Sequence, residues 1–263
     1  FSNWLRENFE AIKQQAESTT SVGKLVEIEQ YVFHNFVSAR FNFTTGDAAG
    51  QNMTGRATYV ACEWIRQQYP QLRHYMLSSN FETEKKPSSL NSLGGRGRRV
   101  TAEITIPKAV LSSLMRATPE QMAYGNQLSL MSSYIAGSTS NAAHPANGLA
   151  ALYIATGQDA GCIGEAVQST VYSYVTRDGD LYFSITLPAL VMATYGGGTG
   201  LPTQRECLEL MDCYGQGKAY KLIEIAAATV LAGELSLGAA TRRNKESGKN
   251  EWVDAHEKLG RNR

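Results

Sequence analysis

The chain has 263 residues, and its 25 lysines and arginines nearly balance 24 aspartates and glutamates, for a net charge of +1. A nearly neutral chain lacks the basic surplus that draws nucleic acid or an anionic membrane by charge alone. With 43% hydrophobic and 19% charged residues the chain is not disordered, and it is long enough to bury a core in one or two domains. Four cysteines, none in a C-x-x-C pair, signal neither zinc nor a redox dithiol and favour a reduced, intracellular protein.

The first 78 residues switch between helical and strand patterns. Residues 3–18 have helical spacing, residues 30–44 alternate as one or two strands, residues 48–68 are helical again, and residues 73–78 alternate as a strand. This order predicts a small α+β domain over residues 1–78.

Residues 79–97 have no period and close with Gly94 and Gly95, so we expect a functional or mobile loop there. A larger domain is predicted over 98–241, followed by an exposed polar tail over 242–263. Its expected elements are a strand at 98–106, helices at 107–116, 118–135 and 143–156, a hairpin over 168–188, a glycine turn at 196–198, and helices at 203–213 and 218–240. The apolar stretch 223–240 contains two glutamates, so it is not predicted to span a membrane.

Two adjacent lysines in the loop could carry chemistry. Pro87 restricts Lys86 to extended geometry, and neighbouring extended residues point to opposite sides. One ammonium group can therefore face a pocket, where it would stabilise negative charge on a carbonyl oxygen or donate a proton. A solvated charge run is the alternative reading.

Other features also have two readings. Asp159 follows an apolar helix, where the helix dipole disfavours an acid, so it is either a turn residue or held by a cation. The glycine-containing segments 46–50 and 196–200 each precede a predicted helix and are either phosphate cradles or tight turns. His144 at a helix start could orient another group, and His256 lies in the polar tail.

Several segments resemble one family in order and spacing. They are Thr-Gly-Asp-Ala-Ala-Gly-Gln-Asn-Met at 45–53, Glu-Lys-Lys-Pro-Ser-Ser-Leu-Asn at 84–91, Ala-His-Pro-Ala-Asn at 143–147, Tyr-Ile-Ala-Thr-Gly-Gln-Asp-Ala at 153–160, Gly-Gly-Gly-Thr at 196–199, and Ala-Gly-Glu-Leu-Ser-Leu at 232–237. They are similar to elements of the HMG-CoA reductases, and the Lys-Lys-Pro form resembles the eukaryotic and archaeal class. The similarity extends over nearly the whole chain.

The resemblance implies an α+β fold with a small ferredoxin-like cofactor-binding domain joined to a larger substrate domain. It implies NAD(P)H-dependent reduction of HMG-CoA to mevalonate by two hydride transfers, with release of CoA. NADPH is the expected cofactor, NADH is the alternative, and a homo-oligomer, either a dimer or a tetramer, is the expected assembly.

The resemblance also implies roles for individual residues. Lys85 would stabilise the oxyanion, Asp159 would hold Lys85, and His256 would protonate the departing thiolate. The implied substrate-binding residues are Ser78, Asn80, Lys86 and Asn147. The implied cofactor-binding residues are Asp47, Asn52, Met53, Gly197, Gly198, Thr199 and Arg261.

The chain departs from the family pattern at four points. The upstream element with the catalytic glutamate is not found, so we expect the chain to begin inside the small domain, with a separate chain as one source of that segment. Gln127 stands where a lysine for the substrate carboxylate is expected, Ser21 falls near the expected 2′-phosphate contact with Lys24 as a substitute, and Glu84 replaces an aspartate.

Three hypotheses therefore stay open. The chain is the catalytic part of a reductase, a divergent reductase for another acyl thioester, or a non-catalytic subunit that keeps the fold. The presence of Lys85, Asp159 and His256 together argues against the third hypothesis. Losing one member of a coupled site removes most activity, so a chain without catalysis would have little physical reason to keep all three.

Overall fold

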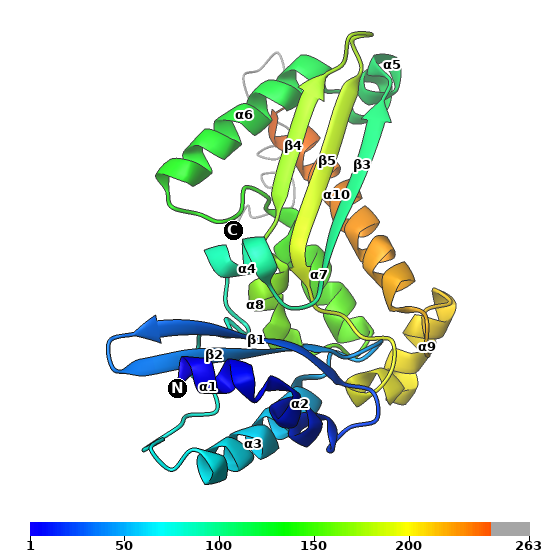
Figure 1. Ribbon diagram of the computed structural model, residues 1–263. Coiled ribbons are helices and arrows are strands. Elements are labelled where there is room, and N and C mark those ends of the chain that lie inside the picture. Colours follow the sequence, from blue (N-terminus) through cyan, green and yellow to red (C-terminus); the bar gives the residue numbers. More distant parts are fainter. Residues whose placement is uncertain (243–263) are drawn as a thin grey trace, which may run out of the picture. The chain divides into compact units, whose positions relative to one another are not determined.

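The computed structural model describes residues 1–242 and divides into two compact units, Phe1–Glu84 and Lys85–Arg263 (Figure 1). Both mix helices with antiparallel sheet, which confirms the α+β class. The division falls inside the loop expected at 79–97, and α4 (Ser89–Gly94) forms within that loop. The tail expected at 242–263 lies outside the described residues except for Arg242, which ends the last helix.

The first unit packs three helices with a two-stranded sheet. Its elements are α1 (Ser2–Glu7), α2 (Phe9–Glu17), β1 (Lys24–Phe33), β2 (Phe36–Thr44) and α3 (Gln51–Gln68). The helix expected over 3–18 is interrupted at Asn8, whose side chain donates to the Trp4 carbonyl at 2.8 Å. Apolar residues at helical spacing form the core, namely Leu5, Ile12, Ala16, Leu25, Ala57, Ala61 and Ile65.

The strand expected at 73–78 is wrong, because these residues form no regular structure. Tyr75 instead donates its hydroxyl to Glu63 of α3 at 2.6 Å, while Met76 is 76% exposed. An alternating segment becomes a strand only when a sheet edge takes its backbone groups. Among the described residues the sheet of this unit has two strands, fewer than the four of a ferredoxin-like sheet.

The second unit is built on a three-stranded antiparallel sheet in the order β3-β5-β4. The strands are β3 (Arg98–Ile106), β4 (Thr170–Val175) and β5 (Leu181–Leu190), so the predicted strand at 98–106 and the predicted hairpin are confirmed. The hairpin turns through Gly179, whose φ of +84° suits glycine. Central strand β5 carries the core, with Leu181, Phe183, Ile185 and Leu187 fully buried.

The helices of this unit pack against the sheet or against one another. They are α5 (Lys108–Val110), α6 (Pro119–Ile135), α7 (His144–Ala155), α8 (Ile163–Ala166), α9 (Pro202–Leu210) and α10 (Ala219–Arg242). Helix α6 packs beside β4, and α10 runs along β3 and β5 (Figure 1). The helix expected at 107–116 is only one α-helical turn, because the chain continues as a π-helix over Leu111–Met115.

Helix α10 is the one helix among residues 1–242 that is long and apolar enough to cross a membrane. Of its most apolar stretch, 56% is buried inside the protein, as in the core helix of a globular protein. The Glu234 carboxylate of this helix accepts the backbone N–H groups of Ala143 and His144 at 3.1 and 2.8 Å. Since Ala143 offers no capping side chain, this carboxylate satisfies the start of α7 and complements its dipole.

Candidate active site

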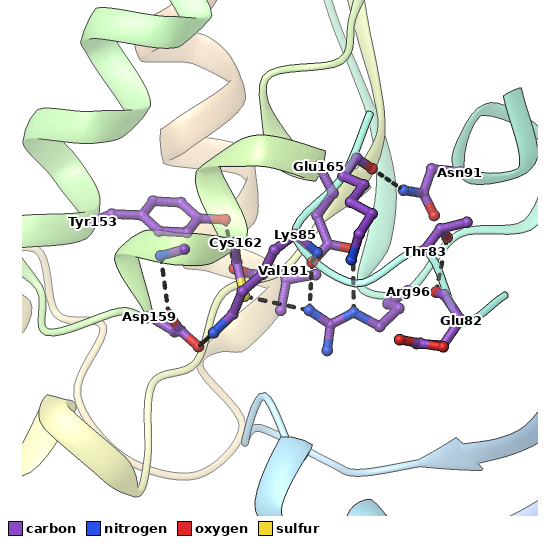
Figure 2. A network of polar contacts seen from close by, with 12 residues as sticks. Glu82, Thr83, Lys85, Asn91, Arg96, Tyr153, Asp159, Cys162, Glu165 and Val191 are labelled. Atoms are coloured by element: carbon purple, nitrogen blue, oxygen red, sulfur yellow. Dashed lines mark hydrogen bonds and ion pairs between the residues drawn. The ribbon is translucent and has the colours of Figure 1, made fainter. Parts of the chain in front are cut away.

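The two predicted catalytic residues of the second unit lie in contact. The Lys85 ammonium Nζ lies 3.0 Å from Oδ2 of Asp159, and the two side chains are 44% and 34% exposed (Figure 2). The other Asp159 oxygen accepts the backbone N–H of Gly161 at 2.9 Å. Asp159 is thus both a turn residue and a partner of a cation, and the two readings from sequence hold together.

Lys85 adopts a backbone conformation that favours glycine. Its φ is +61°, in the left-handed region, which costs a residue with a side chain about 1–2 kcal/mol. Such conformations persist only where surrounding contacts hold them, and they cluster at functional sites.

A buried carboxylate, that of Glu165, contacts the backbone of the lysine. It is fully buried and accepts the backbone N–H of Lys85 at 3.2 Å. Arg96 binds the same carboxylate through Nε at 3.1 Å and through Nη2, as Figure 2 shows. Arg96 Nη2 also lies 3.3 Å from Sγ of Cys162.

Sequence reasoning missed Glu165 and gave Arg96 no role. A signal existed in the stretch 160–167, where Glu165 is the one charged residue in an otherwise apolar or small run. A carboxylate is almost never fully buried unless it is paired, so a glutamate in such a run would need a partner elsewhere in the chain if the run is buried.

The lysine loop is held at two further backbone points. The buried Asn91 donates its side-chain amide to the Lys86 carbonyl at 2.7 Å. The buried Gln168 donates to the Ser88 carbonyl at 2.8 Å and accepts the Ser88 N–H at 3.3 Å. The loop backbone is therefore fixed by buried polar side chains, while Lys86 itself is exposed.

The glycine turn lies against the segment that carries Asp159. It spans Gly197–Gly200, and a Cβ built on Gly198 would collide with the Gly157 carbonyl oxygen. Gln158, next to Asp159, makes hydrogen bonds of 2.8 and 2.7 Å to the backbone of Ala193, four residues before the turn. Thr199, another predicted cofactor residue, is buried and donates to the Gly196 carbonyl at 2.7 Å.

Five predicted site residues lie in the first unit. Asn52 and Met53 occupy the first turn of α3, which starts after Gly50 at φ +77°, and Asp47 precedes that turn. The Met53 sulfur accepts the Thr20 hydroxyl at 2.9 Å. The other two lie at the start of the loop expected at 79–97. Ser78 donates to Glu82 at 2.9 Å, and Asn80 has a φ of +70°.

The remaining candidates are dispersed. Asn147 is exposed on α7, and Gln127 is exposed on α6. The predicted residues His256 and Arg261 lie outside the described residues. Over residues 1–242 no group of three His, Cys, Asp or Glu side chains could hold a metal ion.

Cys162 is expected to react slowly with alkylating reagents, although it lies beside Arg96. Burial raises the pKa of its thiol to about 11, so about one molecule in a thousand carries the thiolate at pH 8. Alkylation by iodoacetamide, followed by mass spectrometry of the Cys162 peptide, should therefore rise about tenfold per pH unit from pH 7 to pH 10. A rate that levels off below pH 9 would contradict the buried environment seen here.

Comparison with known proteins supplies the family context. A family model described as hydroxymethylglutaryl-coenzyme A reductase matches residues 1–261. The chain is 41% identical to the 3-hydroxy-3-methylglutaryl-coenzyme A reductase of Methanocaldococcus jannaschii, over 98% of this chain and 64% of that protein. It is 40% identical to that of Pyrococcus horikoshii, over 99% of this chain and 63% of that protein.

A solved structure shares the fold. The class II 3-hydroxy-3-methylglutaryl-CoA reductase from Streptococcus pneumoniae bound to NADPH superimposes with a TM-score of 0.68 at 21% identity, over 91% of this chain and 66% of that one. The chain therefore spans less than two thirds of the length of the curated relatives it matches.

Proposed function

Since the chain belongs to the hydroxymethylglutaryl-coenzyme A reductase family, we propose that the protein carrying it reduces HMG-CoA to mevalonate with NADPH. The observation that carries this proposal is the ion pair between Lys85 and Asp159. Each of the two residues lies in a segment whose sequence resembles the family. The overall reaction consumes one thioester, two NADPH and two protons, and yields the alcohol, two NADP⁺ and free CoA.

The chain's own residues have distinct parts in this proposal. The Lys85 ammonium stabilises the negative charge that forms on the carbonyl oxygen at each reduction, because it is preorganised before the charge develops. Asp159 keeps that ammonium oriented through its 3.0 Å contact. His256, which lies outside the described residues, protonates the departing thiolate, and Ser78, Asn80, Lys86 and Asn147 bind the acyl portion.

The glycine turn fits a dinucleotide. Gly196 and Gly197 have φ values of +83° and +57°, and a Cβ on either would meet nothing within 4 Å, so the backbone there is open to a ligand. NADPH supplies the hydride when bound. We propose that Gly197, Gly198 and Thr199 hold it by backbone contacts, with Asp47, Asn52, Met53 and Arg261 as further binding residues.

We also propose that the protein acts as a homo-oligomer inside the cell. Helix α6 exposes large apolar side chains at helical spacing, at Tyr124, Leu128, Met131 and Ile135, which are 50–79% exposed. An apolar stripe of this kind is typical of a surface that a partner covers. The four cysteines are free thiols, which supports an intracellular location.

A charge placed in this stripe is expected to weaken the assembly. The variant Leu128→Lys should elute from a size-exclusion column with light scattering at a lower mass than the parent protein, since burying an unpaired ammonium costs several kcal/mol. The control Asp178→Lys places the same side chain in the exposed turn between β4 and β5, outside α6. Equal masses for the parent and Leu128→Lys would place the subunit interface elsewhere.

The activity is tested with HMG-CoA and either NADPH or NADH, by following loss of cofactor absorbance and mevalonate by mass spectrometry. We expect two NADPH oxidised per mevalonate formed. Because Gln127 cannot neutralise a carboxylate, 3-hydroxybutyryl-CoA, which lacks the distal carboxylate, is assayed in parallel. Turnover of 3-hydroxybutyryl-CoA without turnover of HMG-CoA would show that HMG-CoA is not the substrate. If a folded protein reduces neither thioester, the proposal is overturned.

A further inference from the structure

We infer that Glu165 and Arg96 are positioning residues that set the Lys85 backbone and thereby place its ammonium group against Asp159. This inference rests on the proposed function for the catalytic role of Lys85. The geometry that carries it is the chain of contacts from Arg96 to Glu165 to the Lys85 N–H in Figure 2.

Lys85 has a φ of +61°, which a residue with a Cβ adopts only at a cost. The N–H that this conformation presents is taken by Oε1 of Glu165 at 3.2 Å. A carboxylate is a stronger acceptor than a neutral group, so it offsets the cost of the left-handed backbone.

Glu165 is fully buried, and a buried carboxylate is stable only when it is paired and hydrogen-bonded. Arg96 supplies the charge through two nitrogens, in the forked geometry that fixes the direction of a carboxylate. Both oxygens of Glu165 accept from the guanidinium, Oε2 from Nε and Oε1 from Nη2. Here Oε1 also bonds to the backbone of the lysine 80 residues earlier in the chain.

A Cβ on Gly164, the residue before Glu165, would collide with the Lys85 carbonyl oxygen, so glycine allows the backbones to meet there. A Cβ on Gly161 would lie 2.7 Å from Cδ of Lys85, so the lysine side chain passes over that glycine toward Asp159. The segment 161–165 therefore contacts Lys85 at three points, its backbone N–H, its carbonyl group and its side chain.

The test removes the pair without leaving a buried charge. The double variant Arg96→Met/Glu165→Leu replaces a buried ion pair with apolar side chains, an exchange that proteins often tolerate. We expect it to keep its fold by circular dichroism and to lose about 10²-fold in kcat with HMG-CoA, as a misplacement near 1 Å costs. The KM for NADPH should change less than twofold, because the turn at Gly197–Gly200 is untouched.

A second readout needs no activity. Amine acylation of Lys85, measured by mass spectrometry relative to Lys218, should be faster in the double variant than in the parent. Asp159→Asn, which removes the anionic partner, sets the upper limit that the double variant should approach. If the parent fails to reduce HMG-CoA, the proposed function fails, while this labelling still decides whether the pair positions the lysine.

Milder variants keep the inference testable if the double variant does not fold. Glu165→Gln keeps the size of the side chain but leaves one acceptor oxygen, for which Lys85 N–H and Arg96 compete. The kcat and the rate of Lys85 labelling should therefore lie between those of the parent and the double variant. The matched control is Lys108→Met/Glu120→Leu, which removes a surface pair whose side chains are 55% and 57% exposed and should change neither readout. Unchanged kcat and unchanged Lys85 labelling in folded Glu165→Gln and double variants would overturn the inference.

Discussion

Replacing Lys85 with methionine is expected to lower kcat for HMG-CoA reduction by about 10²–10³, the range seen when a preorganised donor to an oxyanion is removed. Methionine keeps most of the side-chain length and removes the charge. Because Lys85 is 44% exposed and its partner Asp159 is 34% exposed, the ion pair contributes little to stability. The loss should therefore fall on catalysis, with the thermal unfolding midpoint nearly unchanged.

The adjacent lysine provides the matched control. Lys86 carries the same charge, is exposed, and is proposed to bind substrate, so Lys86→Met should mainly raise the KM for HMG-CoA. Both variants are assayed for NADPH oxidation over a range of HMG-CoA concentrations, with thermal melts in parallel. Normal turnover by Lys85→Met would remove this residue from the mechanism.

The fold was most predictable where an element repeats its pattern over many residues. The helix expected at 118–135 is α6 over Pro119–Ile135, with Thr118 and Gln121 forming a capping box at its start. The strand expected at 98–106 has the observed bounds of β3. In such segments the signals that set the bounds lie within the segment itself, so a single sequence is informative.

Prediction failed in two segments whose backbone the periodicity alone did not determine. Residues 73–78 alternate like a strand, but Tyr75 is held by Glu63 of α3. The expected helix at 107–116 becomes a π-helix and ends at Arg116 with φ +53°. Sequence periodicity reports which side of a segment is apolar, and it does not report which element lies opposite.

The candidate site divides in the same way. Lys85 and Asp159 could be named from short motifs, and a turn acid held by a cation was one of the two readings for Asp159. Glu165 could not be assigned, because its role depends on contacts to Arg96 and to Lys85, 69 and 80 residues away in the chain. Burial of a charge is a property of the folded chain, and a lone glutamate in sequence reads by default as exposed.

The contact between Gly157 and Gly198 likewise comes from the fold, and it supports the second large effect. The variant Gly198→Ala would place a methyl group against the Gly157 carbonyl oxygen, and neither backbone can yield without moving the turn or the segment leading to Asp159. Overpacking of this kind typically costs about 1–3 kcal/mol of unfolding free energy. We expect Gly198→Ala to melt at a lower temperature and to bind NADPH more weakly, measured by differential scanning calorimetry and fluorescence titration.

Gly200→Ala is the matched control, because it makes the same change in the same turn. A Cβ on Gly200 meets nothing within 4 Å, and neither glycine has a positive φ, so the two variants differ mainly in the contact with Gly157. Gly200→Ala should keep the unfolding temperature within experimental error of the parent protein. If both variants lower the unfolding temperature equally, the cause is the loss of a glycine in the turn and not the contact with Gly157. If Gly198→Ala alone is impaired, the contact links the proposed cofactor turn to the segment that presents Asp159 to Lys85.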